Sequence, residues 1–211
     1  MGRKKKSKNS NWLIRQKRDE YVRRARLEGY RSRAAYKLEQ LHQRDRLFKS
    51  GDVVLDLGAS PGSWSQFAAR QIGPNGRVVA VDLLPMKTLA GVDFMQGDIA
   101  RSETQLLIKE CLGLTGADLV ISDVAPNISG IRDTDQAQCI ELAEKARNLA
   151  LGVLKANGRF VVKIFEGELS VAFREQTRAF FDQVLVRKPG ASRSESREVY
   201  IVALRPTRRT V

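Results

Sequence analysis

The alternation of short apolar runs with helix-like segments, from residue 53 onward, is the feature that most constrains the fold. Runs rich in valine, leucine and isoleucine predict buried strands, and segments with apolar residues at helical spacing follow most of them. The last two runs have no helix-length segment between them, so we expect them to pair antiparallel. This order predicts an α/β fold with a doubly wound, largely parallel sheet. The predicted strands are 53–57, 77–82, 92–98, 117–123, 159–164, 183–187 and 199–204.

Helices are predicted where apolar residues recur at helical spacing and capping residues flank the segment. Ser32 and Ser102 are expected to be N-caps, and Gly158 is expected to end the long helix before it. Cys111 and Cys139 lie in two of these helices at no zinc-binding spacing, which predicts reduced packing residues of a cytosolic protein. The predicted helices cover 19–27, a segment after Ser32, 63–72, 102–111, 135–155 and 169–181.

A glycine-rich turn joins the first predicted strand to the helix after it. The run Val53–Leu57 passes through Gly58, Pro61 and Gly62 into a helix that begins near Ser63. A helix N-terminus reached in this way presents unpaired backbone N–H groups, which suit a nucleotide-like ligand. The glycine spacing is not the G-x-G-x-x-G of dinucleotide-binding proteins, and there is no Walker A lysine. Two interpretations stay open from this turn alone: a ligand crevice, or a tight connection that binds nothing.

Acidic residues follow three of the predicted strands, and each taken singly could be a turn residue. Ligands of open α/β sheets bind at the carboxyl ends of the strands, so Asp82, Asp98 and Asp123 should share one rim. Asp82 could accept two hydrogen bonds from a ribose diol, and Asp98 one from an exocyclic amine. Lys163 lies inside an apolar strand, where it should reach a partner or extend to the rim. Glu198 precedes the final strand and is expected near Asp123 and Lys163.

The positive charge is concentrated in the N-terminal segment. Residues 1–48 hold 16 lysines and arginines against 5 acidic residues, whereas residues 49–211 hold 21 against 19. Aromatic residues are interleaved with the N-terminal cations, and this combination favours RNA over a membrane surface. A solubilising tail is the alternative interpretation. No apolar run approaches the roughly 18 residues of a membrane span, and no secretory signal is seen, so we expect a cytoplasmic protein.

Five motifs occur in an order typical of one enzyme family. They are SRAAYKL at 32–38, LDLGASPGSW at 55–64, SDVAPNISG at 122–130, VKIF at 162–165 and SESREVY at 194–200. On these motifs the chain resembles the FtsJ/RrmJ-like 2′-O-ribose RNA methyltransferases over about residues 30–204. The resemblance implies a Rossmann-like S-adenosylmethionine-dependent methyltransferase fold. In that fold a seven-stranded, mostly parallel sheet has an antiparallel last strand and helices on both faces.

The resemblance also implies site residues and a cofactor. It implies a catalytic tetrad of Lys37, Asp123, Lys163 and Glu198. S-adenosyl-L-methionine is the implied methyl donor, and no metal is implied. The implied cofactor-binding positions are Gly58, Gly62, Trp64, Asp82, Asp98 and Asp123.

The implied substrate is ribosomal RNA, most closely a uridine of 23S rRNA within the 50S subunit or its precursor, methylated by a monomer. Residues 1–30 would form a basic, partly disordered RNA-binding arm, and residues 31–211 the methyltransferase domain. A tRNA 2′-O-ribose methyltransferase of the same family is an alternative. A non-catalytic RNA-binding protein of ribosome assembly is another, and a nicotinamide oxidoreductase is disfavoured by the missing dinucleotide motif.

A sugar hydroxyl is a poor nucleophile until its proton is removed. The resemblance makes Lys163 the general base, which requires the neutral form of its amine. Burial and the charge of Lys37 favour that form, whereas Asp123 and Glu198 favour the charged form. Alternatively, both lysines stay charged and orient the ribose. His42 matches no catalytic position of the family and is expected to be a solvated helix residue.

Overall fold

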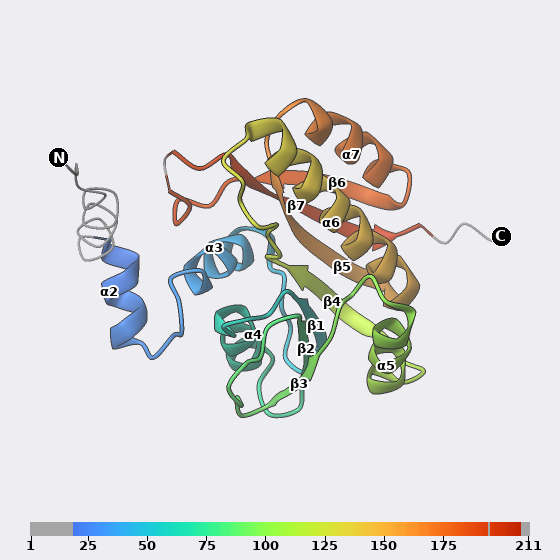
Figure 1. The fold of residues 1–211 in the computed structure, drawn as a ribbon. Helices are drawn as coiled ribbons and strands as arrows, with labels where there is room; N and C mark the ends of the chain where they lie inside the picture. The colour runs from blue at the N-terminus through green and yellow to red at the C-terminus, as the bar shows by residue number, and fades with distance from the viewer. Residues whose placement is uncertain (1–18, 194, 208–211) are drawn as a thin grey trace.

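Seven strands form a single sheet in the order β3-β2-β1-β4-β5-β7-β6. The computed structural model describes residues 19–193 and 195–207. The strands are β1 (Val53–Leu57), β2 (Arg77–Asp82), β3 (Val92–Gln96), β4 (Ala117–Ser122), β5 (Leu154–Phe165), β6 (Phe181–Arg187) and β7 (Glu198–Pro206). The helices, labelled in Figure 1, are α2 (Glu20–Leu27), α3 (Ala35–Asp45), α4 (Ser63–Ile72), α5 (Ser102–Leu112), α6 (Arg132–Val153) and α7 (Glu168–Arg178).

Of the seven strands, β7 runs against the rest. β1 pairs in parallel with β2 and β4, β3 pairs in parallel with β2, and β5 pairs in parallel with β4. β7 lies between β5 and β6 and is antiparallel to both. The mostly parallel sheet with an antiparallel last strand is therefore confirmed, as is the antiparallel pairing of the last two strands.

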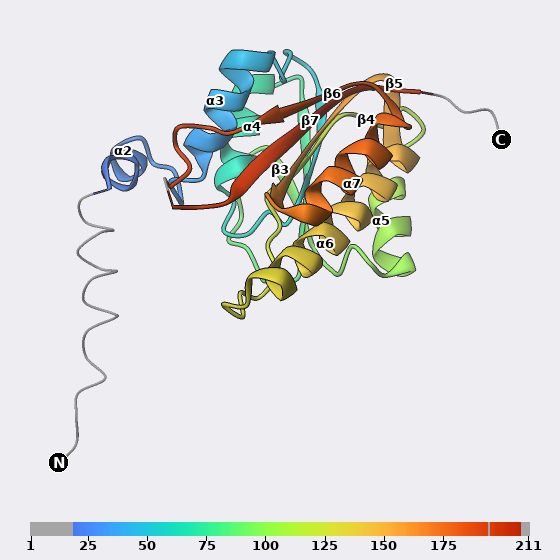
Figure 2. The same ribbon diagram turned by 90° about the horizontal axis from the view of Figure 1, so that it is seen from above.

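The helices cover both faces of the sheet, as Figure 2 shows from above. α3 and α4 pack on one face, where Trp64 belongs to the core, and α5, α6 and α7 pack on the other, where Phe173 does. Each strand supplies both cores because successive side chains point to opposite faces. In β4, Leu119 and Ile121 enter the first core, whereas Val120 enters the second.

Two of the predicted N-caps are wrong. α3 begins at Ala35 with Ala34 at the N-cap position. The Ser32 hydroxyl accepts a hydrogen bond of 3.2 Å from the N–H of Ala34, in the turn before the helix, and lies 2.7 Å from the hydroxyl of Ser63 at the start of α4. Ser102 is the first residue of α5 rather than its cap. The Ser32 side chain therefore links the turn before α3 to the first residue of α4.

The long helix α6 is displaced towards the N-terminus from its predicted range. It begins before Asp135, whose carboxylate accepts hydrogen bonds of 2.7 Å from the backbone N–H and the hydroxyl of Ser129 and so closes the preceding turn. It ends at Val153 because Leu154 is extended and pairs with Ala117 at the start of β5. The predicted helix end at Gly158 is therefore wrong.

The described part of the basic N-terminal segment contacts the domain. Ala25 of α2 is buried with Tyr36 and Ala191, and the guanidinium of Arg24 lies 4.5 Å from the centroid of the Tyr36 ring. The first 18 residues of the predicted arm lie outside the described residues. A division at residue 30 therefore stays a prediction. No helix in the described ranges combines the length and apolar character that crossing a membrane requires.

Candidate active site

The carboxyl ends of four neighbouring parallel strands bring the predicted acidic residues to one rim. Asp82 is the last residue of β2, Asp98 lies two residues beyond β3, and Asp123 directly follows β4. β1 lies between β2 and β4, and the direction in which strands are added reverses there. Ligands of doubly wound sheets bind at this kind of reversal, so the structure places all three carboxylates at the expected position.

Lys163 projects from β5 towards Asp123. Its side chain is on the α3/α4 face of the sheet, because it lies two residues beyond Val161 of that core. The lysine is only 6% exposed. Its Nζ donates a hydrogen bond of 2.6 Å to the backbone carbonyl oxygen of Asp123 and lies 3.0 Å from the carboxylate oxygen Oδ1 of the same residue. The buried strand lysine therefore has the partner that the sequence led us to expect.

The final strand adds two more groups to the same cluster. Tyr200 pairs with Lys163 across the β5–β7 ladder, and its hydroxyl donates a hydrogen bond of 2.9 Å to Asp123 Oδ1. Glu198 lies two residues earlier on the same face. Its carboxylate oxygen Oε1 forms an ion pair with Nζ of Lys37 in α3, at a distance of 2.7 Å. The four residues expected to form a tetrad therefore meet as two ion pairs, with Tyr200 on the carboxylate of the first.

Tyr200 received no role from the sequence, although it lies in one of the motifs. The signal that could have found it is its spacing of two from Glu198, which places both side chains on one face of a strand. Burial and the nearby Asp123 carboxylate raise the pKa of Tyr200 well above its ordinary value. The phenol therefore stays protonated at neutral pH and donates a hydrogen bond to the Asp123 carboxylate.

The lysines keep the Asp123 carboxylate ionised. Burial alone would raise its pKa, but the charges of Lys163 and Lys37 oppose it, together with hydrogen bonds from Lys163 and Tyr200. The balance holds the pKa of Asp123 below its ordinary range. The site thus contains a fixed negative charge beside a buried amine.

Trp64 packs between the start of α3 and Tyr200 of β7, next to the cluster of Lys37, Asp123, Lys163 and Glu198. Its indole N–H donates a hydrogen bond of 2.8 Å to the carbonyl of Ala34, just before α3, and its ring lies 5.7 Å from that of Tyr200. The side chain is 3% exposed, so it packs the helix that carries Lys37 against β7. The backbone N–H of Trp64, in the first turn of α4, is the part of this residue that can still face a ligand.

The glycines of the turn after β1 are required by close packing. Gly58 has φ +77°, and a Cβ built there would lie 2.8 Å from the Cβ of Val124. Gly62 has φ +107°, and a Cβ there would lie 2.8 Å from atoms of Arg31, Met86 and Leu89. Both positions favour glycine through backbone conformation and through space. The turn is therefore enclosed by other segments rather than a bare connection.

The backbone already engages the carboxylates of Asp82 and Asp98. Asp82 accepts hydrogen bonds from the N–H groups of Ser60, at 2.8 Å, and Leu84, at 2.7 Å. Asp98 accepts one of 2.9 Å from the N–H of Ala100. A carboxylate has about four lone-pair positions, so each acid can still accept further hydrogen bonds from a ligand. Their orientation is fixed before any ligand arrives.

Asp56 is a further buried acid that the sequence reasoning did not single out. It lies in β1 below the glycine turn and is 1% exposed. Its Oδ2 accepts a hydrogen bond of 2.6 Å from the hydroxyl of Ser65, whereas its Oδ1 is buried without a partner in the described part of the chain. Burial raises the pKa of Asp56 to about 7, and the charges of Asp123 and Asp82 act in the same direction. The signal in the sequence was a single acid inside an apolar strand.

His42 is not the solvated residue that was predicted. Its ring packs against Phe48 and Phe67, and its Nδ1 accepts a hydrogen bond of 3.2 Å from the backbone N–H of Phe48. Burial and the charge of Arg159 lower the pKa of His42.

Cys111 and Cys139 are free thiols within α5 and α6, as predicted. Among the described residues, no group of three or more His, Cys, Asp or Glu is arranged to hold a metal ion.

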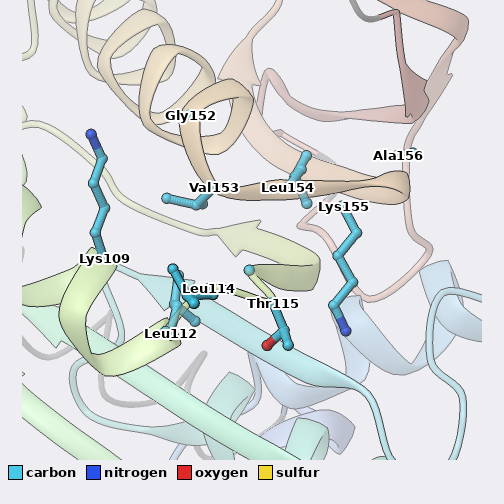
Figure 3. Close-up of a pocket in the computed structure, with 11 residues that line it drawn as sticks. Lys109, Leu112, Leu114, Thr115, Gly152, Val153, Leu154, Lys155 and Ala156 are labelled. Atoms are coloured by element: carbon cyan, nitrogen blue, oxygen red, sulfur yellow. The ribbon is translucent and has the colours of Figure 1, made fainter.

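Two hollows distinguish the ends of the sheet. One of 370 Å³ adjoins the Lys37–Glu198 pair and is also lined by Arg33 and Arg193. Another of 310 Å³, drawn in Figure 3, lies before the first residues of β4 and β5, between Lys109 and Lys155. None of the predicted site residues lines the second hollow. All the predicted site residues therefore lie away from this second hollow.

Comparisons with known proteins agree with this geometry. The family model described as FtsJ-like methyltransferase matches residues 30–206. The ribosomal RNA large subunit methyltransferase E of Cellvibrio japonicus is 50% identical over 198 residues, which cover 93% of this chain and 94% of that protein. The protein of the same name from Marinobacter nauticus is 50% identical over 199 residues, covering 94% and 96%.

Two solved structures are similar to this one. A protein of Plasmodium falciparum described as a ribosomal RNA methyltransferase has a TM-score of 0.75 at 26% identity, covering 84% of this chain and 98% of that one. The fibrillarin of Aeropyrum pernix, solved with S-adenosyl-L-methionine bound, has a TM-score of 0.56 at 18% identity, covering 83% and 75%. The second likeness concerns the fold alone.

Proposed function

This chain belongs to the FtsJ-like methyltransferase family, and on that premise we propose that it methylates the 2′-hydroxyl of a ribose in ribosomal RNA. S-adenosyl-L-methionine is the methyl donor expected for this fold and family. The observation that carries the proposal is the pairing of Lys163 with Asp123 and of Lys37 with Glu198 at the carboxyl end of the sheet. The names of the relatives from C. japonicus and M. nauticus support RNA of the large ribosomal subunit as the substrate.

The residues at the rim fit S-adenosylmethionine. The turn from Gly58 to Gly62 leads into the N-terminus of α4, whose first N–H groups suit the carboxylate of the methionine part. Asp82 would accept from the ribose hydroxyls, and Asp98 lies one strand further along, on the adenine side. The Oδ1 of Asp56, buried below the turn and without a hydrogen-bond partner among the described residues, adds a polar atom to this end of β1. When bound, the cofactor supplies a methyl group already activated by its sulfonium.

The protein must therefore orient the acceptor ribose and take its proton, and the surroundings of Lys163 suit that task. A neutral amine has two N–H groups and one lone pair. The carbonyl oxygen and Oδ1 of Asp123, at 2.6 and 3.0 Å, can receive the two N–H groups. The lone pair is then left for the proton of a 2′-hydroxyl. Lys163 is the proposed general base, and Asp123 stabilises its conjugate acid once the proton has moved.

Lys37 and Glu198 are proposed to position the ribose rather than to take its proton. Their ion pair of 2.7 Å holds both side chains beside the 370 Å³ hollow, with 14% and 12% of their surfaces exposed. Arg33, Arg193 and Glu195 line the same hollow, and Arg33 is paired with Asp19, so Arg193 is the cation proposed to contact RNA phosphates here. We propose that the RNA strand approaches from this side, with its target ribose over Lys163.

The finer proposal is a uridine of 23S rRNA, methylated in the 50S subunit or its precursor by a cytoplasmic monomer. The test is to incubate the protein and labelled S-adenosylmethionine with naked 23S rRNA, 50S subunits, 30S subunits and tRNA, and then to map the 2′-O-methyl group. Label on one uridine of the large-subunit RNA is expected. Label on tRNA alone would favour the tRNA alternative. Tight RNA binding without label on any RNA would favour a non-catalytic assembly protein.

The basic N-terminal segment is proposed to bind RNA outside the catalytic site. Deleting residues 1–18 removes eight lysines and arginines while leaving the α2 contacts with Tyr36 intact. We expect weaker binding to rRNA and a smaller dependence on salt, by about 0.7 in the logarithmic slope for each lost phosphate contact. Unchanged melting would show that the fold is spared. RNA affinity equal to that of the full chain would reduce this segment to a solubility device.

A further inference from the structure

Arg31 connects three segments around the cofactor turn. Its Nη1 donates hydrogen bonds of 2.8 Å to the carbonyl of Pro61, in the turn after β1, and of 2.8 Å to the carbonyl of Lys87. Its Nη2 donates one of 2.9 Å to the carbonyl of Thr88. Lys87 and Thr88 belong to segment 83–91, which leaves the cofactor rim directly after Asp82. One guanidinium therefore ties the turn to the segment that follows the predicted ribose-binding acid.

The backbone of Arg31 is itself held in place. Its N–H donates a hydrogen bond of 2.8 Å to the side-chain oxygen of Gln66 in α4, and the amide nitrogen of Gln66 donates one of 3.0 Å to the carbonyl of Gly29. The residues before α3 are thus anchored to the same helix whose N-terminus forms part of the cofactor site. The side chain of Arg31 acts from a fixed position.

Segment 83–91 has few other attachments. Seven of its positions, 83–85, 87, 88, 90 and 91, are exposed, whereas Met86 and Leu89 turn their side chains towards Gly62 at close range. In the described part of the chain, the carbonyls bound by Arg31 are the only groups between 85 and 90 that hydrogen-bond to a segment outside 83–92. Segments with few buried contacts and few hydrogen bonds open most readily. Arg31 therefore supplies a large part of what holds segment 83–91 beside the turn 58–62.

We propose that Arg31 is a positioning residue that holds the turn 58–62 and segment 83–91 in the geometry that binds the cofactor. The proposal rests on the cofactor site described above and adds to it a residue that acts through the backbone of the two segments. Arg31 also lines a 260 Å³ hollow with Tyr30, Arg33 and Arg193 on the side from which RNA is proposed to approach. It is thus placed between the RNA surface and the cofactor turn.

The test is calorimetric titration of the full chain with S-adenosylhomocysteine, without RNA, using R31A, R31K and a control. R31A should lower the affinity about tenfold, because it removes the three hydrogen bonds by which Arg31 holds the turn 58–62 and segment 83–91. R31K should lower it nearly as much, because one ammonium cannot reproduce the planar fork that reaches three carbonyls. The control is K87A. It removes an exposed charge from the same segment but keeps the carbonyl that Arg31 binds, so its affinity should match the wild type.

A second measurement does not depend on the cofactor. Hydrogen exchange of residues 83–91 in the free protein should accelerate in R31A and R31K and stay unchanged in K87A. In turnover assays the R31A defect should appear as a higher KM for the methyl donor with kcat largely kept. Affinity for S-adenosylhomocysteine within twofold of the wild type, with unchanged exchange and weaker RNA binding, would overturn the proposal and make Arg31 an RNA contact only. If the wild type itself failed to bind S-adenosylhomocysteine, the cofactor site would be wrong, and the exchange measurement would still decide the role of Arg31.

Discussion

Strand β5 carries a shielded cation at each end of the sheet, and the protein uses the two differently. At the amino end, Arg159 lies 2.7 Å from a carboxylate oxygen of Asp52, with 11% and 7% of the two side chains exposed. At the carboxyl end, Lys163 lies 3.0 Å from Asp123, with 7% and 18% exposed. An arginine keeps its charge at any physiological pH, whereas a lysine can give up its proton. We infer that the buried pair of Arg159 and Asp52 stabilises the fold, whereas the buried pair of Lys163 and Asp123 serves the proposed proton transfer.

Replacing the buried lysine should separate the two ends most clearly. Lys163→Ala removes the proposed general base, so we expect methyl transfer at saturating substrates to fall by 10² to 10⁴, roughly the range of general-base catalysis. Affinity for S-adenosylhomocysteine should change little, because Lys163 is not among the expected cofactor ligands. Single-turnover assays and calorimetry measure the two quantities. Near-normal turnover would remove Lys163 from the mechanism.

The matched change at the other end should affect stability instead. Arg159→Met leaves the Asp52 carboxylate buried without its cation, which typically costs about 3 kcal/mol in the free energy of unfolding. Urea denaturation measures this loss, and turnover by the protein that remains folded should stay near normal. The double variant Arg159→Met, Asp52→Asn is the control and should recover part of the stability. A large loss of turnover in either variant would contradict the division between the two ends.

The buried Asp56, at the carboxyl end of the sheet, should make the stability of the fold depend on pH. Its pKa is raised to about 7, so between pH 4 and pH 7 the folded state holds a proton that the unfolded state has lost. Stability should therefore fall as pH rises through this range, by about 3 kcal/mol from pH 5 to pH 8 for this group alone. In Asp56→Asn that contribution is absent. Denaturation of both proteins across this range should show the variant gaining relative stability as pH rises, and a constant difference would refute the assignment.

The smallest effect is expected from the hydroxyl that supports Asp123. Tyr200→Phe removes the hydroxyl that donates a hydrogen bond of 2.9 Å to Asp123 Oδ1. We expect this change to lower kcat about fivefold, equivalent to about 1 kcal/mol. The pKa of Asp123 should rise, because the Tyr200 hydrogen bond is one of the causes that lower it. An NMR titration of the Asp123 carboxyl carbon should accordingly show protonation at higher pH than in the wild type. An unmoved titration would mean that Tyr200 only packs against Trp64.

Several features of this site could be predicted from local sequence. Parallel strands fix the rim that Asp82, Asp98 and Asp123 share, and alternation along β5 fixes the face of Lys163. These inferences depend on periodicity and chain order alone. Lys37 was assigned to this site only through family resemblance, because its place depends on how α3 docks on the sheet, and its pairing with Glu198 was not predicted.

Other features depend on contacts between segments distant in sequence, which periodicity does not encode. The contacts of Arg31 with Lys87 and Thr88 belong to this class, as does the packing of the half-buried His42 ring against Phe67. The helix boundaries failed for a related reason. The Ser32 side chain and Leu154 are engaged by partners far along the chain, Ser63 and Ala117.

The position of β7 in the sheet has a consequence for the order in which the enzyme becomes active. A ribosome synthesises the chain from its N-terminus at about 5–20 residues per second, and domains fold as the chain emerges. The strand that supplies Glu198 and Tyr200 emerges after β5 and β6, yet it belongs between them in the sheet. A nascent chain lacking Glu198–Pro206 already carries the cofactor turn but has neither the partner of Lys37 nor the hydroxyl donor to Asp123. On the proposed mechanism, catalytic competence therefore waits until β7 has been inserted between β5 and β6.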